Sequence, residues 1–197
     1  MVAANSNPPL APASGLVLIV GGSRSGKSRW AETLAKASGR SVLYLATAAD
    51  RPGDLDWQRR LALHQQRRPG DWSCVETGPD LCSALSELRT SKQADSAPVV
   101  LIDSLGTWLA QHLDVGDQQW QARQDELLSA LQQLSAPVLL VAEEVGMGVV
   151  PSTAIGCRFR DRMGTCLQAL MQQATASWLV VAGRAVDLHA IGLRVPA

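Results

Sequence analysis

The residues whose types and spacing point most clearly to chemistry lie in one short stretch, GGSRSGKSRWAE, at residues 21–32. Gly21, Gly26, Lys27 and Ser28 satisfy the pattern G-x-x-x-x-G-K-[ST], which binds nucleotide phosphates between a strand and a helix. In this pattern the backbone amides surround a phosphate, the lysine reaches the β and γ phosphates, and the serine hydroxyl can bind Mg²⁺. The residues expected to hold the phosphates are Gly21, Gly22, Ser23, Arg24, Ser25, Gly26, Lys27 and Ser28.

Three further polar residues close or follow apolar runs along the chain, namely Thr47, Asp103 and Glu144. Because ligands bind at the carboxyl ends of the strands in open α/β sheets, we expect all three near the bound nucleotide. Asp103 can hold Mg²⁺ from the side opposite Ser28, or it can cap the helix that begins near Ser104. For Glu144 three roles stay open: supporting the metal, binding the hydroxyl that receives a phosphate, and holding the tight turn VGMG.

A basic segment, LDWQRRLALHQQRRPGDW at residues 55–72, contains another group of candidate residues. Considered alone, it is typical of a solvated helix. It also permits nucleophilic chemistry, because a neutral imidazole at His64 can attack the α-phosphorus of a nucleoside triphosphate and form a phosphoramidate. The neighbouring Arg60, Arg67 and Arg68 would neutralise charge on the transferred group. We expect the other histidines, which lack such surroundings, to be surface or structural residues; they are His112 and His189.

Apolar runs predict the strands that would position these side chains, at residues 16–20, 41–46, 72–76, 98–103, 137–142 and 177–182. Most of the runs are continuously apolar, which indicates a parallel sheet covered by helices on both faces. Two longer segments have apolar residues at helical spacing, one with Trp120, Leu127, Leu128, Leu131 and Leu134, the other with Phe159, Met163, Leu167, Leu170 and Ala174. Alternating strands and helices predict an α/β fold with a mostly parallel, P-loop NTPase-like sheet.

Length and composition narrow the possible functions. The chain has 197 residues, and its 18 basic and 18 acidic residues leave no net charge, which argues against nucleic acid as a partner. We expect a disordered tail at residues 1–14, which are small, Pro-rich and uncharged, and a single catalytic domain at residues 15–197. The absence of a C-x-x-C pair and of any apolar stretch long enough for a bilayer predicts a cytoplasmic protein with reduced thiols.

Six motifs occur in order along the chain: GGSRSGKSRWAE, VLYLATA, RLALHQQRRPGDWSCVE, LIDSLGTWLA, EEVGMGVVP and FRDRMG. On these motifs the chain from Leu16 to about Leu188 resembles the family of bifunctional adenosylcobinamide kinases / adenosylcobinamide-phosphate guanylyltransferases of cobalamin biosynthesis. The first motif continues through Arg29 and Glu32, well past the general phosphate-binding pattern.

The resemblance implies two successive reactions. Enzymes of this family transfer the γ-phosphoryl group of ATP or GTP to the aminopropanol hydroxyl of adenosylcobinamide. They then guanylylate themselves on a histidine with GTP, release pyrophosphate and pass GMP to the new phosphate, which yields adenosylcobinamide-GDP. The family's histidine falls on His64, and by the same resemblance Glu76 contacts the guanosine, while Arg60, Arg67 or Arg68 orients the triphosphate or GMP. The family forms trimers, which implies a homo-oligomer here.

Some positions depart from the family pattern, and two rival functions stay open. Ser23 replaces the usual Ala, Glu143 stands where Asn is common and adds a charge near the phosphates, Leu167 replaces an Asn, and Thr175 replaces an acid. A P-loop kinase of small molecules without nucleotidyl transfer would keep the loop and have no need of His64. A regulatory nucleotide-binding switch would also keep the loop.

Overall fold

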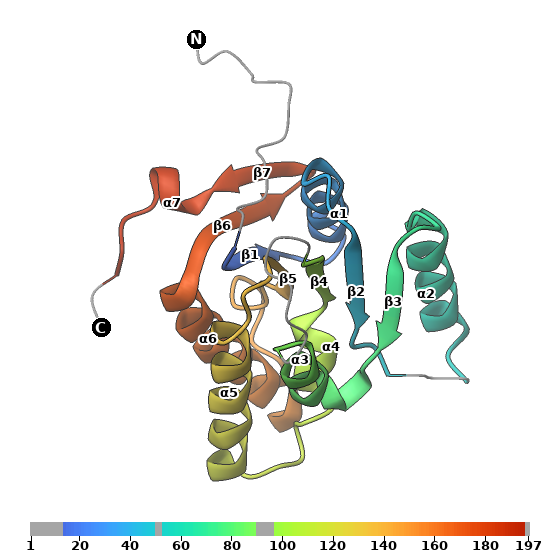
Figure 1. Ribbon diagram of the computed structural model, residues 1–197. Coiled ribbons are helices and arrows are strands. Elements are labelled where there is room, and N and C mark those ends of the chain that lie inside the picture. The colour runs from blue at the N-terminus through green and yellow to red at the C-terminus, as the bar shows by residue number, and fades with distance from the viewer. Residues whose placement is uncertain (1–13, 50–52, 90–96, 196–197) are drawn as a thin grey trace.

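The structure, a computed structural model, describes residues 14–49, 53–89 and 97–195. These residues form one seven-stranded sheet with the order β3-β2-β4-β5-β1-β6-β7 (Figure 1). The strands are β1 Leu16–Gly21, β2 Val42–Ala46, β3 Ser73–Glu76, β4 Val99–Asp103, β5 Val138–Glu143, β6 Ala174–Val181 and β7 Arg184–Asp187. Strands β1 to β6 pair in parallel, and β7 pairs antiparallel with β6. The expected mostly parallel α/β sheet is confirmed.

The predicted strands agree with the observed bounds within one residue at each end, except for β6. That strand begins at Ala174, so the prediction that Ala174 lies on the apolar face of the preceding helix was wrong. Pairing with Leu16 of β1 draws Ala174 into the sheet. Strand β7 was not predicted. It follows a two-residue turn in which Ala182 and Gly183 have φ values of 49° and 74°, and positive φ at both positions suits a tight hairpin.

The helices alternate with the strands, as predicted. They are α1 Lys27–Ala37, α2 Leu55–Arg67, the short 3₁₀ helix η1 Gly78–Asp80, α3 Leu81–Arg89, α4 Leu105–Ala110, α5 Asp117–Gln132, α6 Ala154–Gln173 and α7 Leu188–Ile191. The apolar stripes predicted for α5 and α6 are buried at Trp120, Leu127, Met163 and Leu170. Leu134 lies beyond the end of α5, yet it is buried as well.

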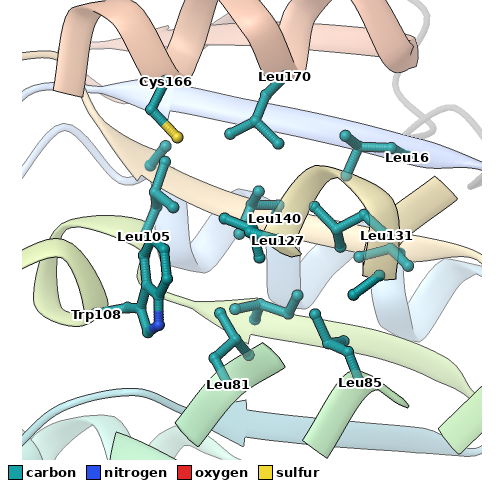
Figure 2. Close-up of a cluster of buried hydrophobic side chains, with 14 of the residues drawn as sticks. Leu16, Leu81, Leu85, Leu105, Trp108, Leu127, Leu131, Leu140, Cys166 and Leu170 are labelled. Carbon is teal, nitrogen blue, oxygen red and sulfur yellow. The ribbon is translucent and has the colours of Figure 1, made fainter. Parts of the chain in front are cut away.

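Helices cover both faces of the sheet. On one face α1 packs its residues Ala31, Leu34 and Ala35 against the strands. On the opposite face α3, α4, α5 and α6 pack against the sheet in a larger cluster (Figure 2). The residues labelled in that view are Leu16, Leu81, Leu85, Leu105, Trp108, Leu127, Leu131, Leu140, Cys166 and Leu170. Burying one such leucine stabilises the fold by about 2 kcal/mol. The many apolar residues of the two clusters therefore hold the helices against the sheet.

The strand order brings together three strand ends that are far apart in the sequence. Strand β1 ends at Gly21, β4 at Asp103 and β5 at Glu143, and β5 lies between the other two. In the sheet Gly21 is opposite Glu143, and Asp103 is opposite Val141. The loop that follows β1 therefore lies beside two acidic residues that come from other strands.

Three further expectations concern the chain as a whole. The expected tail at residues 1–14 lies outside the described residues, apart from Ser14. No helix in the described part of the chain is both long and apolar enough to cross a membrane. The four cysteines are free, as expected: Cys74, Cys82, Cys157 and Cys166. Burial raises the pKa of Cys82 and Cys166 to about 12, which keeps both thiols protonated.

Candidate nucleotide-binding site

The loop between β1 and α1 has the backbone geometry that a phosphate-binding turn requires. Gly26 has a φ of 102° and Arg24 a φ of 58°, so the chain turns sharply before the helix begins. A Cβ atom at Gly21 would collide with the backbone of β6 and lie 2.6 Å from the Ser25 hydroxyl oxygen. The amide of Gly183 in the β6–β7 turn donates a hydrogen bond of 2.9 Å to the Ser25 carbonyl oxygen. The unpredicted hairpin therefore supports the loop from behind.

Lys27 lies at the start of α1 with its ammonium group over the loop. Its Nζ donates to the Gly22 carbonyl oxygen at 3.3 Å and lies 3.8 Å from a carboxylate oxygen of Glu143. The other oxygen of Glu143 accepts a hydrogen bond of 2.8 Å from the Gly106 amide at the start of α4. Burial raises the pKa of Glu143, and the nearby Lys27 opposes that shift. Glu143 therefore lies beside Lys27, close to the glycine loop.

The Ser28 hydroxyl and the Asp103 carboxylate meet across the gap between α1 and β4. Ser28 Oγ donates to Asp103 Oδ1 at 3.3 Å, and the hydroxyl of Tyr44 donates to Asp103 Oδ2 at 2.8 Å. Helix α4 has Ser104 rather than Asp103 at its N-cap, with a reciprocal pair of hydrogen bonds to Thr107. Of the two roles considered for Asp103, capping is thus taken by its neighbour, and the carboxylate faces Ser28.

Thr47 follows β2 as predicted, but its side chain is fully buried. Its hydroxyl oxygen lies 2.6 Å from the Ser104 carbonyl oxygen and accepts a hydrogen bond of 2.9 Å from the Ser104 amide. A second hydroxyl, that of Thr107, lies 2.6 Å away. The Thr47 hydroxyl is therefore occupied in joining the ends of β2 and β4. Thr47 was expected near the bound nucleotide, and its buried side chain supports the strand ends there.

Glu144 connects the end of β5 to the loop through its backbone. Its amide donates to the Gly21 carbonyl oxygen at 3.0 Å. Its side chain accepts a hydrogen bond of 2.5 Å from the Gly146 amide, and Arg160 donates to the Gly146 carbonyl oxygen at 2.6 Å. Of the three roles left open for Glu144, holding the turn is the one that these hydrogen bonds show.

Helix α2 carries the predicted nucleophile at the β3 edge of the sheet (Figure 1). The helix begins after Asp54, whose side chain accepts from the Trp57 amide at 3.0 Å, and the Trp57 indole donates to the Ala49 carbonyl oxygen at 3.0 Å. His64 and Arg60 belong to this helix, while the position of their side chains lies outside the described structure. His64 comes one helical turn before the end of α2.

Two arginines attach that end of α2 to the body of the protein. Arg67 donates to the Glu32 carboxylate of α1 at 3.1 Å, and the side chain of Glu32 is only 7% exposed. The guanidinium carbon of Arg68 lies 3.7 Å from the centre of the Tyr44 ring in β2. The first contact is with α1, which also carries Ser28. The second is with Tyr44 of β2, whose hydroxyl donates to Asp103. The structure thus brings the basic segment against the face of the sheet that α1 covers.

A shallow pocket of about 500 Å³ opens beside this attachment. It is lined by Gln65, Arg68, Pro69, Gly70, Trp72, Cys74 and Glu76. Glu76 is exposed at the end of β3, so its carboxylate is available to a ligand in the pocket. The pocket therefore combines an acid, a guanidinium group and an indole within one concave surface next to the histidine helix.

The other two histidines have structural partners, as expected. A ring nitrogen of His112 lies 3.3 Å from the Pro79 carbonyl oxygen, and the ring packs edge-on against Trp108 with centroids 5.0 Å apart. Burial lowers the pKa of His112, which favours the neutral imidazole. His189 Nδ1 lies 2.9 Å from the hydroxyl of Ser177. The prediction that His112 and His189 are surface or structural residues is confirmed.

Two residues in contact with the site received no individual role from the sequence, Tyr44 and Glu32. Tyr44 is the only tyrosine of the chain and lies in an otherwise aliphatic strand, which was the available signal that its hydroxyl has a partner. Glu32 is an acid on the buried side of α1, and a buried acid requires a partner. In both cases the partner lies on a distant segment.

Comparison with known proteins places the chain among enzymes of one family. Residues 17–188 match the family described as cobinamide kinase / cobinamide phosphate guanyltransferase. A bifunctional adenosylcobalamin biosynthesis protein CobP from Pseudomonas aeruginosa is 37% identical over 172 residues, which cover 87% of this chain and 95% of that protein. A bifunctional adenosylcobalamin biosynthesis protein CobU from Escherichia coli is 35% identical over 189 residues, which cover 88% of this chain and 99% of the relative.

Solved structures with low sequence identity were also found. The flagellar accessory protein FlaH from Methanocaldococcus jannaschii is 14% identical with a TM-score of 0.47, covering 90% of this chain and 77% of that chain. A KaiC-like protein from Pyrococcus horikoshii is 18% identical with a TM-score of 0.48, covering 84% of this chain and 70% of that chain. At these TM-scores neither structure supports an inference about the function of this chain.

Proposed function

The chain belongs to the cobinamide kinase / cobinamide phosphate guanyltransferase family, and we propose which of its residues perform the two reactions. The enzyme phosphorylates cobinamide and then transfers a guanylyl group to cobinamide phosphate, in the biosynthesis of cobalamin, with ATP and GTP as its nucleotide substrates. The observation that carries the assignment is the contact of Ser28 with Asp103 at the start of α1, directly after Lys27 and the glycine loop.

We assign a Mg²⁺ site to Ser28 and Asp103. Their side-chain oxygens lie 3.3 Å apart, and a hydroxyl with a carboxylate is the type of donor set that Mg²⁺ takes in phosphate sites. Bound there, the ion would neutralise charge on the phosphate oxygens. The loop amides from Gly21 to Ser28 and the ammonium group of Lys27 bind the phosphates directly.

In the first reaction the acceptor hydroxyl of cobinamide attacks the γ-phosphorus. A bond forms between the hydroxyl oxygen and this phosphorus, the bond to the β,γ-bridging oxygen breaks, and the hydroxyl loses its proton. The nucleoside diphosphate then leaves. Lys27 stabilises charge on the β and γ phosphates, so it contributes to this step whichever nucleotide is the donor.

In the second reaction the imidazole of His64 attacks the α-phosphorus of GTP. An N–P bond forms, the bond to the α,β-bridging oxygen breaks, and pyrophosphate leaves from the same loop. A phosphate oxygen of cobinamide phosphate then attacks the phosphoramidate and releases the imidazole. Of the three candidate arginines, we assign Arg60 to neutralising charge on the α-phosphate, because Arg67 and Arg68 contact Glu32 and Tyr44.

The pocket beside β3 is the proposed site for the guanosine. The carboxylate of Glu76 can accept hydrogen bonds from the guanine edge, and Trp72 offers a flat apolar surface to the base. Thr47 and Glu144 act as positioning residues, because their side chains hold strand ends and a turn of the site. Residues 15–197 act as one catalytic unit. The enzyme assembles as a trimer, and the molar mass of the purified protein measured by light scattering tests this.

The guanylylation assignment is tested with GTP labelled at the α-phosphate. The wild-type protein is incubated with this nucleotide and Mg²⁺, denatured, and examined for bound label. We expect label that is labile to acid and stable to alkali, as a phosphoramidate is, and no label in His64→Ala. A matched control, His189→Gln, replaces a histidine that contacts Ser177 and is expected to keep the label.

The kinase assignment is tested by measuring phosphorylation of cobinamide and guanylyl transfer in the Lys27→Ala variant, purified in the same way as the wild type. Loss of one preorganised cationic group removes about 3 kcal/mol of transition-state stabilisation, so both reactions should slow by about 100-fold. A wild-type protein that binds GTP and phosphorylates cobinamide without taking up label would be a kinase without nucleotidyl transfer. A protein that binds GTP and modifies neither substrate would be a regulatory switch.

A further inference from the structure

We propose that Tyr44 is a positioning residue that connects the arginine end of the histidine helix α2 to the Mg²⁺-binding carboxylate Asp103. The inference rests on the proposed Mg²⁺ site and on the proposed role of His64. Contacts run from Arg68 to Tyr44 and from Tyr44 to Asp103. Through them, binding of a nucleotide in the phosphate loop is coupled to the position of α2.

The first link is the hydrogen bond between Tyr44 and Asp103. Tyr44 is 1% exposed, and its hydroxyl donates to Asp103 Oδ2 at 2.8 Å. Ser28 donates to the other oxygen, Oδ1, at 3.3 Å. Because one oxygen is held by Tyr44, the carboxylate keeps its other oxygen directed at Ser28. Partners of this kind set the orientation of metal ligands and affect metal affinity.

The second link is the contact between Tyr44 and Arg68. The guanidinium carbon of Arg68 lies 3.7 Å from the centre of the Tyr44 ring, close enough for a cation–π contact. Arg68 directly follows the last residue of α2, and it also donates to the Cys74 sulfur of β3 at 3.1 Å. A movement of Tyr44 would therefore reach the end of the helix that carries His64.

The third observation is that the same end of α2 is held to the phosphate-loop helix. Arg67 donates to Glu32 at 3.1 Å, and Glu32 lies in α1 shortly after Lys27 and Ser28. Arg67 and Arg68 thus attach one helix end to α1, which carries Ser28, and to β2, which carries the tyrosine that contacts Asp103. Because one ion pair and one cation–π contact join these elements, a shift in one element changes the energy of the other.

Coupling of this kind is reciprocal. If the docked position of α2 favours a correctly oriented Asp103, then binding of Mg²⁺ and nucleotide must favour the docked position of α2 to the same degree. The expected consequence is that nucleotide in the loop holds the histidine helix in place, and that Tyr44 transmits the effect.

The test uses α,β-methylene GTP, which binds without transferring its guanylyl group. Calorimetric titrations of the full chain at a series of Mg²⁺ concentrations give the Mg²⁺ concentration for half-maximal binding. We expect this value to rise about tenfold in Tyr44→Phe, which keeps the ring and removes the hydroxyl. We expect a rise of about threefold in Arg68→Met, which keeps an apolar stem and removes the charge.

The double variant separates the coupled role from a direct contact. In the Tyr44→Phe background, Arg68→Met is expected to have no further effect on the Mg²⁺ requirement, because the link is already broken. If the two effects multiply independently, Arg68 acts by touching the nucleotide and the proposal is wrong. The matched control Arg59→Met removes an exposed arginine of the same helix, paired with Asp56, and should leave the value unchanged.

A second measurement follows the helix itself. Hydrogen exchange of the peptide that covers α2 should slow when Mg²⁺ and α,β-methylene GTP bind to the wild-type protein, and should not slow in Tyr44→Phe. Equal protection in both proteins would overturn the coupling. Neither measurement requires label transfer, so an absence of label on His64 would refute the guanylylation assignment without deciding this one.

Discussion

Among the residues that the structure describes, Lys27 contacts one backbone oxygen and one carboxylate. Its ammonium group contacts the Gly22 carbonyl oxygen at 3.3 Å and the Glu143 carboxylate at 3.8 Å. Burial raises the pKa of Glu143, and Lys27 together with hydrogen bonds from Ser104 and Gly106 opposes that shift. A phosphate that draws Lys27 toward the loop must therefore compete with an internal ion pair.

This competition predicts the effect of Glu143→Gln on nucleotide binding. The amide oxygen can still accept from the Gly106 amide, while Lys27 no longer gives up an ion pair when GTP binds. A gain of about 1 kcal/mol corresponds to about fivefold tighter binding, measured by calorimetry with Mg²⁺ present. The control Glu126→Gln neutralises an exposed acid paired with Arg123 and should bind GTP like the wild type. Weaker binding by Glu143→Gln would show that the carboxylate assists the nucleotide instead.

Among the helices, one arginine of α6 binds the segment that connects α4 to α5. The Arg162 side chain is 6% exposed and donates to the carbonyl oxygens of His112 and Val115 at 3.0 and 2.8 Å, and to Asp117 at 3.1 Å. It also lies over the Trp120 ring, with 5.2 Å between the guanidinium carbon and the ring centre. This arginine belongs to the FRDRMG motif, whose observed role here is structural.

Arg162→Met should therefore lower stability and leave the chemistry intact. Loss of the charge-assisted hydrogen bonds that the buried Arg162 makes to two backbone carbonyl groups is expected to reduce the free energy of unfolding by about 2–3 kcal/mol, measured by urea denaturation. Arg123→Met removes an exposed arginine and should change it by less than about 0.5 kcal/mol. Folded Arg162→Met protein that fails to label with GTP would indicate a role in the site.

The strands were predictable because continuous apolar runs reflect burial on both faces of a parallel sheet. Strand β7 was not, because its four residues RAVD carry no such run. It forms because the turn at Ala182 and Gly183 folds the chain back and because Gly183 donates to the phosphate loop. Ala174 was misassigned for a related reason, since pairing with a neighbouring strand decides where β6 begins.

At the scale of the whole molecule, His112 makes stability depend on pH. Burial lowers its pKa in the folded state, so between the folded value and the ordinary value of about 6.5 the unfolded chain binds more protons. The stability that the neutral imidazole contributes is fully present above pH 6.5 or so and is lost as the pH falls toward the folded pKa. The melting temperature should therefore fall between about pH 7 and pH 5, and it should fall less steeply in His112→Gln. Identical slopes in the two proteins would contradict this assignment.

The sequence by itself determined the phosphate-binding loop, the parallel α/β sheet and the place of Asp103 at a strand end near that loop. Each depends on local spacing, or on the general rule that strand ends meet at one edge of such a sheet. Only the tertiary structure decided that Tyr44 holds Asp103 from 59 residues away and that Arg67 meets Glu32 across 35 residues. These contacts follow from β2 lying beside β4 and α2 ending against α1, and an arrangement of that kind depends on how the whole core packs rather than on any local pattern.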